Sequence, residues 1–143
     1  MNIMHKQNGF SMLEALVTLV IVSLGLLGIA GIIANSLKVN QGAQIRSQAS
    51  WLANDIIDRM RANRTTAEGG AYVLDDCADA PAAGVSVAGD DLSQWCAAVA
   101  AALPTGTGAV ALDTNKVTVT VQWDDTRAAG GVADQQFVVE TRL

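Results

Sequence analysis

The residues best placed to do chemistry lie together near the N-terminus. Glu14 adjoins residues 15–34, of which fifteen are apolar and none is charged. A carboxylate within hydrocarbon is costly, roughly 2.5–3.5 kcal/mol for a central Asp and less toward the ends of a span, and no cation lies within one helical turn of Glu14. Cleavage after Gly9 would create a cation, the α-amine of Phe10, with which Glu14 of a neighbouring subunit could pair. The alternative is an interfacial Glu14 that simply extends into water.

Residues 15–34, the apolar segment, account for the composition of this 143-residue chain. Mean hydropathy is +0.29, 16% of the residues are charged, and the net charge of −5 resides entirely in residues 35–143. Twenty helical residues span about 30 Å, the hydrocarbon thickness of a bilayer, so we predict a membrane span rather than a buried core helix. The composition excludes a disordered tail, a coiled coil and a basic nucleic-acid binder, so no nucleic-acid partner is expected.

Among the first nine residues, positions 5–8 are all polar and include His5 and Lys6. In a secretory signal peptide, a small-residue cleavage site follows the apolar stretch. Here the small residue, Gly9, precedes it, so cleavage after Gly9 would leave the apolar segment on the mature protein. The alternative is an uncleaved signal anchor, with Lys6 holding the N-terminus in the cytoplasm.

The order of residues from Gly9 to Val17, GFSMLEALV, strongly resembles the type IV prepilin signature. That signature combines a short basic leader, Gly, Phe, three residues, Glu and a long apolar helix. The resemblance implies cleavage by prepilin peptidase after Gly9 and N-methylation of Phe10. It also implies that Glu14 sets register and recruitment during filament assembly.

Apolar residues continue at helical spacing beyond the apolar segment. Ile45, Ala49, Leu52, Ile56 and Met60 step by four, three, four and four, which predicts an amphipathic continuation over residues 35–64. One helix is therefore expected from about residue 10 to residue 63. Its second half should lay its apolar stripe on the remainder of the chain, residues 65–143, which we call the head. Such a long helix with a head is the lollipop architecture that the resemblance to pilins implies.

Two features of this helix keep more than one interpretation. Gly25, Gly28 and Gly31 favour either close helix packing in the bilayer or a segment that unwinds when the subunit leaves the membrane. Residues 58–64, DRMRANR, resemble the same stretch in the PilV group of minor pilins, the type IV pilus modification proteins. This arginine-rich run, with Arg59, Arg61 and Arg64, is either a solvated helix end or a docking surface.

Cys77 and Cys96 are the only cysteines. If Lys6 lies inside the cell, the head lies outside the inner membrane in an oxidising compartment, so a disulfide is favoured. Closing this loop contributes around 3 kcal/mol in the chain-entropy model. No metal site is expected, because the only histidine, His5, would leave with the leader.

The head is predicted to contain one short helix and a small antiparallel sheet. The helix is expected to be capped by Asp90 or Asp91, with Leu92, Trp95 and Val99 on one face. Strands are expected over 116–123 and 135–141, joined by a long loop over 124–134, with a third near 109–112. The fold class is therefore α+β, a pilin-like lollipop with its long N-terminal helix packed on the sheet.

The head offers little for catalysis. Thr105 to Gly108 lacks the Lys-Ser/Thr of a phosphate-binding loop and is interpreted as a turn. The acidic pairs lack EF-hand spacing and are interpreted as solvated loops rather than Ca²⁺ ligands; they are Asp75-Asp76, Asp90-Asp91 and Asp124-Asp125. Neither a catalytic residue nor a cofactor is predicted, and an enzyme is not expected.

These observations divide the chain into a cleaved leader (1–9), a transmembrane and assembly helix (10–34), its amphipathic continuation (35–64) and a periplasmic α+β head (65–143). The predicted function is that of a minor type IV pilin which helps to initiate or modify the pilus. Expected partners are prepilin peptidase, other minor pilins, the major pilin, the inner-membrane assembly platform and the inner membrane itself. A minor pseudopilin of a type II secretion system is the first alternative, and a DNA-uptake or adhesive pilin is another.

Overall fold

The fold was analysed in a computed structural model that describes residues 11–114 and 116–143. It divides into two compact units, Met1–Leu37 and Lys38–Leu143, which are described separately below. The predicted leader over residues 1–9, the cleavage site at Gly9 and Phe10, and the methylation site at Phe10 lie outside the described residues.

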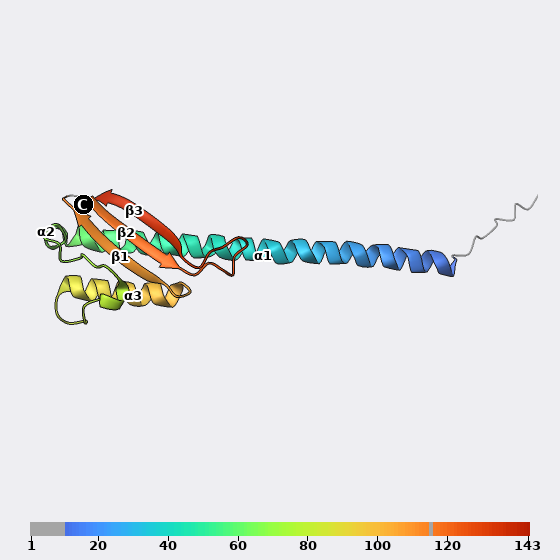
Figure 1. Ribbon diagram of the computed structural model, residues 1–143, viewed down its shortest axis with the longest axis horizontal. Helices are drawn as coiled ribbons and strands as arrows, with labels where there is room; N and C mark the ends of the chain where they lie inside the picture. The colour runs from blue at the N-terminus through green and yellow to red at the C-terminus, as the bar shows by residue number, and fades with distance from the viewer. Residues whose placement is uncertain (1–10, 115) are drawn as a thin grey trace, which may run out of the picture. The chain divides into compact units, whose positions relative to one another are not determined.

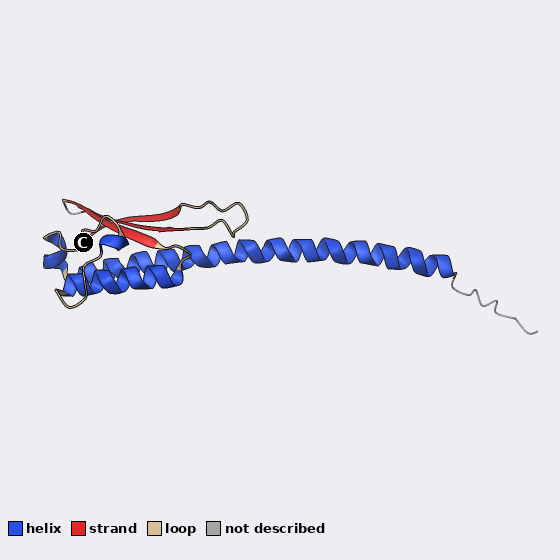
Figure 2. Cartoon of the chain, turned by 60° about the horizontal axis from the view of Figure 1, so that its bottom comes forward, coloured by secondary structure: helices blue, strands red, loops and turns tan. Residues whose placement is uncertain are grey.

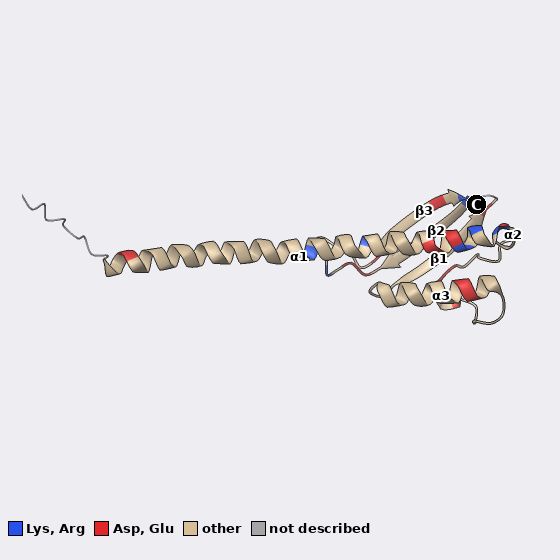
Figure 3. Cartoon of the chain, turned by 180° about the vertical axis from the view of Figure 1, so that it is seen from behind, with Lys and Arg blue, Asp and Glu red and all other residues tan. Residues whose placement is uncertain are grey.

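One helix, α1, runs from Met12 to Ala62, close to the predicted range of 10–63. Within the first unit every described residue is exposed. In the same helix, an 18-residue stretch has a mean hydropathy of 2.7, and none of it is buried. The helix is long and apolar enough to cross a membrane. Two hydroxyl groups in this part of the helix donate hydrogen bonds to its own backbone: Thr18 Oγ1 to the Ala15 carbonyl (2.9 Å) and Ser23 Oγ to the Leu19 carbonyl (2.6 Å). Figure 3 shows this length of helix without charge beyond its first turn.

The second unit is an α+β fold, as predicted. After α1 it contains α2 (Arg64–Glu68), a 3₁₀ turn (Cys77–Asp79), α3 (Val87–Ala102), β1 (Thr107–Asp113), β2 (Lys116–Trp123) and β3 (Gln135–Arg142). The strands form one antiparallel sheet in the order β1-β2-β3, with Val110 opposite Val119 and Val119 opposite Val139 (Figure 1). The sheet forms one layer, and α3 with the second half of α1 forms the other (Figure 2).

The core lies between these two layers. Alternation along β2 places Val117, Val119, Val121 and Trp123 on the buried face. From α1, the core receives the predicted stripe together with two further residues, Ala53 and Ile57; its buried members are Ala49, Leu52, Ala53, Ile56, Ile57 and Met60. Burying an aliphatic side chain contributes about 1.5–3 kcal/mol, so this stripe is what fixes the second half of α1 to the sheet.

The beginning of α3 differs from the prediction. Its N-cap is Ser86, whose hydroxyl accepts a hydrogen bond from the Gly89 amide (3.0 Å), rather than Asp90 or Asp91. Asp90 lies within the first turn, where a carboxylate is favoured by the helix dipole. The predicted cap was wrong because a carboxylate one turn inside a helix gives a sequence signal similar to that of a cap.

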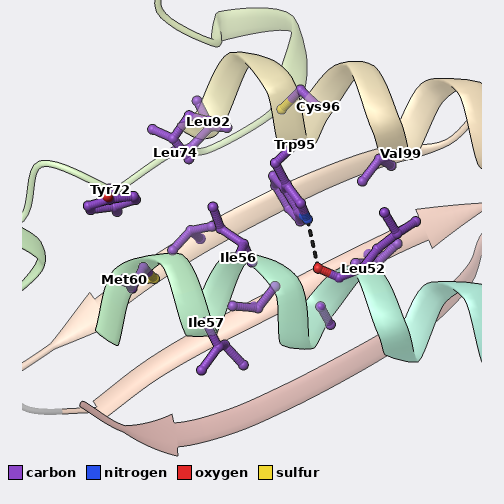
Figure 4. Close-up of a cluster of buried hydrophobic side chains, with 14 of the residues drawn as sticks. Leu52, Ile56, Ile57, Met60, Tyr72, Leu74, Leu92, Trp95, Cys96 and Val99 are labelled. Atoms are coloured by element: carbon purple, nitrogen blue, oxygen red, sulfur yellow. Dashed lines mark hydrogen bonds between the residues drawn. The ribbon is translucent and has the colours of Figure 1, made fainter. Parts of the chain in front are cut away.

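Trp95 on α3 connects three elements of the core. Its Nε1–H donates to the carbonyl of Leu52 on α1 (2.9 Å), as Figure 4 shows, and its ring lies against Gly108 on β1. A Cβ added at Gly108 would overlap the ring, so this position requires glycine. The turn predicted over residues 105–108 is therefore only partly correct, because Thr107 and Gly108 belong to β1 and Gly108 serves close packing.

We predict that Gly108→Ala lowers the free energy of unfolding by about 1–3 kcal/mol, because the added methyl group overpacks the contact with Trp95. Gly69→Ala is the matched control, since its added Cβ would make only ordinary contacts and Gly69 has right-handed helical backbone angles. Denaturant unfolding of the full-length protein in detergent, followed by near-UV circular dichroism, measures both. Equal stability of the two variants would contradict this packing role.

Candidate functional site: the N-terminal carboxylate and the arginine-rich end of α1

Glu14 lies in the first turn of α1 and is exposed. The Ser11 carbonyl accepts hydrogen bonds from the amides of Glu14 (3.0 Å) and Ala15 (3.2 Å), which starts the helix immediately before it. Among residues 11–114 and 116–143, no cation lies within 4 Å of the Glu14 carboxylate. The helix dipole favours a carboxylate at this end by about 0.3–1 kcal/mol but supplies no full charge. The described chain thus presents an acid beside an apolar surface.

Gly25, Gly28 and Gly31 make no contacts that would require their small size. A Cβ at Gly25, Gly28 or Gly31 would meet nothing within 4 Å. The structure therefore neither pairs these residues with another element nor interrupts the helix at them. Both interpretations of the glycines, close packing against other helices and unwinding, remain predictions.

At the other end of α1, Arg59 enters a hydrogen-bonded network that joins α1 to α3. Its Nε donates to Asp55 (3.0 Å) and its Nη1 donates to Asp91 (3.3 Å). The second oxygen of Asp91 accepts a short hydrogen bond from the hydroxyl of Tyr72 (2.6 Å), which also accepts one from Asn63 (3.3 Å). The network therefore links the end of α1 and the loop that contains Tyr72 to the first turns of α3.

The other arginines of the run also make contacts within the chain. Arg61 pairs with Asp58 (3.0 Å) and reaches the Thr141 hydroxyl on β3 (3.2 Å), while Arg64 pairs with Glu68 (2.7 Å). Arg59 is half-buried and has a structural partner on α3, whereas Arg61 and Arg64 remain about half exposed or more. For these two arginines, both interpretations, a solvated helix end and a docking surface, remain predictions. Neither Tyr72 nor Asp91 was assigned to this role from the sequence, since partners so far from Arg59 along the chain leave no periodic signal.

Cys77 and Cys96 form the disulfide that the sequence favoured, with an S–S distance of 2.08 Å. The bond joins the 3₁₀ turn to α3, and both of these elements lie against β1. An open hollow beside the disulfide has more alanines in its lining than any other residue type, and its few polar side chains are those of Asp76, Ser93 and Thr107. Within this lining the Thr107 hydroxyl donates to Asp76 (3.0 Å), which also caps the 3₁₀ turn.

The acidic pairs are used in different local structures. Asp76 caps the 3₁₀ turn, Asp90 accepts the Gly84 amide, and Asp124 accepts the Thr126 amide (2.8 Å). Within the described residues, no group of three or more potential metal ligands comes together. Asp125 differs from the others because its side chain is buried.

Comparison with known families identifies only the N-terminal region. Residues 4–30 match the family model described as the prokaryotic N-terminal methylation motif. No significant match was found among curated proteins or solved structures. The match supports a type IV pilin-like protein, a class that includes the pseudopilins and is structural rather than enzymatic. It also implies processing by prepilin peptidase, membrane anchoring by the apolar helix and assembly with pilus-type machinery.

We predict that Tyr72→Phe lowers the free energy of unfolding by about 1–3 kcal/mol, because Asp91 loses a hydrogen-bond donor. Burial, then the hydrogen bond to Asp91, raises the pKa of Tyr72 above 10.0. A raised pKa means that the folded state favours the neutral phenol. The contribution is therefore complete below pH 10 and is lost as the pH rises from 10 through the raised value.

Denaturant unfolding at several pH values measures the difference between the wild type and Tyr72→Phe. Because Tyr72 is the only tyrosine, ultraviolet absorbance titration of the native protein measures its pKa directly. An ordinary pKa in that titration, or a stability difference that persists unchanged at high pH, would contradict the proposed role of the hydroxyl.

Proposed function

We propose that this chain is a minor type IV pilin of the PilV group, a structural subunit that helps to initiate or modify the pilus. The observation that carries the proposal is the exposed Glu14 at the start of an uncovered apolar helix, within a stretch that matches the methylation motif. The resemblance of residues 58–64 to PilV proteins supports the group assignment.

The chemistry of assembly follows from charge neutralisation. Prepilin peptidase would cleave after Gly9 and free the α-amine of Phe10, which is then N-methylated and remains cationic. Glu14 of one subunit and Phe10 of its neighbour would form an ion pair in apolar surroundings, where an unpaired carboxylate is costly. The pair would favour the one axial register that brings both charges together, while apolar helices bundle around it.

The subunit would wait in the inner membrane with its head in the periplasm and then enter the pilus on the cell surface. Its expected partners are the assembly platform, the other minor pilins and the major pilin, with prepilin peptidase acting first. The disulfide between Cys77 and Cys96 is consistent with an oxidising compartment. A minor pseudopilin of a type II secretion system shares the same N-terminal chemistry, and the neighbouring genes would distinguish the two.

Mass mapping of the N-terminus tests the proposal on membrane-extracted protein. We expect the mature chain to begin at N-methylated Phe10. Recovery of an intact Met1 terminus from cells with active prepilin peptidase would refute it. In the same cells, Glu14→Ala should be cleaved normally but should fall roughly tenfold or more in sheared filaments, since a pair worth about 1.4 kcal/mol changes an equilibrium tenfold.

Glu68→Ala is the control for Glu14→Ala, because it removes an exposed carboxylate whose ion pair is with Arg64 of the same short helix, α2. Its incorporation into filaments should match the wild type. Normal amounts of Glu14→Ala in sheared filaments would contradict the role of Glu14.

We also predict that incorporation shields Trp51. This side chain is 67% exposed on α1, whereas Trp95 and Trp123 are buried. Tryptophan is enriched in the buried centres of protein interfaces, and helices must bundle in a pilus of this type. Hydroxyl-radical footprinting read by mass spectrometry should show strong oxidation of Trp51 in the membrane subunit and several-fold protection in filaments. Trp51 of Glu14→Ala, which stays in the membrane, should remain oxidisable, and equal oxidation of the two wild-type pools would refute the prediction.

A further inference from the structure

The connection between β2 and β3, residues 124–134, which we call the strap, lies against α1 within the second unit (Figure 2). The closest approach is between Ala128 and Gly42, where an added Cβ would lie 2.9 Å from the Ala128 Cβ. The strap has its own backbone hydrogen bonds. The Asp125 amide donates to the Val132 carbonyl (2.9 Å), and the Ala128 amide donates to the backbone carbonyl of Asp125 (2.9 Å). It is thus a folded loop seated on a small residue of the helix.

Asp125 is the one buried charged residue in the described part of the chain, with 1% of it exposed. Neither of its carboxylate oxygens has a hydrogen-bond partner among the described residues. The nearest cation is Arg46 on α1, whose Nη2 lies 3.6 Å from Asp125 Oδ2 and whose side chain is 60% exposed. The ion pair is therefore unequal, because one partner is buried and the other is largely in water.

The other carboxylates of the strap are placed differently. Asp124 accepts hydrogen bonds from the side chain and backbone of Thr126, which lower its pKa. Asp134 is exposed and accepts a hydrogen bond from Gln122 (3.1 Å). Only Asp125 has been removed from water without replacement hydrogen bonds.

A buried carboxylate without hydrogen bonds destabilises the state that buries it, unless a cation compensates. At 3.6 Å, and mostly hydrated, Arg46 compensates only in part. Opening of the strap would return Asp125 to water and remove this cost. The closed loop therefore contains a built-in tendency to open, which Arg46 opposes.

We propose that the strap opens and closes on α1 while the rest of the second unit stays folded, and that the ion pair between Arg46 and Asp125 holds it closed. In the closed state the strap covers Gly42 and borders Val39 and Ala43 on the same side of the helix. Opening uncovers Gly42, whereas Val39 and Ala43 are exposed already in the closed state. The proposal concerns residues 38–143 alone and does not depend on the pilin assignment.

Because Asp125 is buried and Arg46 is largely exposed, removing one partner of this ion pair should have a different effect on strap opening from removing the other. Removing Arg46 leaves a buried, uncompensated charge and should open the strap. Removing the charge of Asp125 leaves only an exposed arginine, which water solvates, and should close the strap or leave it unchanged. An ordinary ion pair would be weakened comparably by either change.

Hydrogen–deuterium exchange of the full-length protein in detergent micelles, read on peptides covering residues 124–134, measures strap opening. We expect Arg46→Gln to speed exchange there roughly tenfold, with β2 unaffected, because it leaves the charge of Asp125 uncompensated. Asp125→Asn should exchange at the wild-type rate or more slowly, and the double variant should behave like Asp125→Asn. Asp134→Asn, which removes an exposed charge from the same strap, is the matched control and should not change the rate.

Gly42→Ala tests the same device without changing charge. The added methyl group would press on the Ala128 Cβ, so the strap must lift and exchange should become faster. Gly28→Ala makes the same helical substitution with nothing within 4 Å and should leave the strap unchanged. The proposal is overturned if Asp125→Asn speeds exchange as much as Arg46→Gln, or if the wild-type strap exchanges only as slowly as the β2 core.

Discussion

The insertion of Trp95 between α1 and β1 is the contact on which the second unit depends. The indole donates its N–H to the Leu52 carbonyl, and its ring requires the absence of a side chain at Gly108. Trp95 thereby fixes how α3 packs against both α1 and β1. The disulfide from Cys96, the next residue, joins the 3₁₀ turn to the same part of α3, which gives this helix a second, covalent attachment.

The two halves of the long helix have different surroundings, because the first is uncovered and the second packs against the sheet. Along its first half the hydroxyls bond back to the helix and the described residues of the first unit are uncovered, so this apolar surface remains available to lipid or to other helices. Along its second half a stripe of side chains is buried under the sheet, and Arg59 closes the end through Asp91 and Tyr72. Arg59 therefore stabilises the end of the helix against α3, which gives one arginine of the run a role within the chain.

Local periodicity predicted much of this fold. The alternation in β2 indicated its bounds, residues 116–123, and the spacing of apolar residues indicated the stripe of α1. What could not be predicted arises from contacts distant in sequence. Gly108 looked like part of a turn because Trp95 lies on another element, and Asp91 looked like a cap because Tyr72 and Arg59 are far from it along the chain. At the N-terminus, the order of Gly9, Phe10 and Glu14 carries the family signal, whereas nothing in the local sequence distinguishes the buried Asp125 from its neighbour Asp124.

The strand order has a consequence for the order in which the chain is made. The apolar stripe of α1 ends at Met60, but the central strand that covers it is complete only at Trp123, and β3 is the last element. At about 5–20 residues per second, the ribosome leaves this stripe without its sheet for roughly 3–13 s. During synthesis the anchoring helix emerges first and the core that shields its second half emerges last. An interval therefore exists in which the half-made chain presents the apolar stripe of its second half without the sheet that buries it.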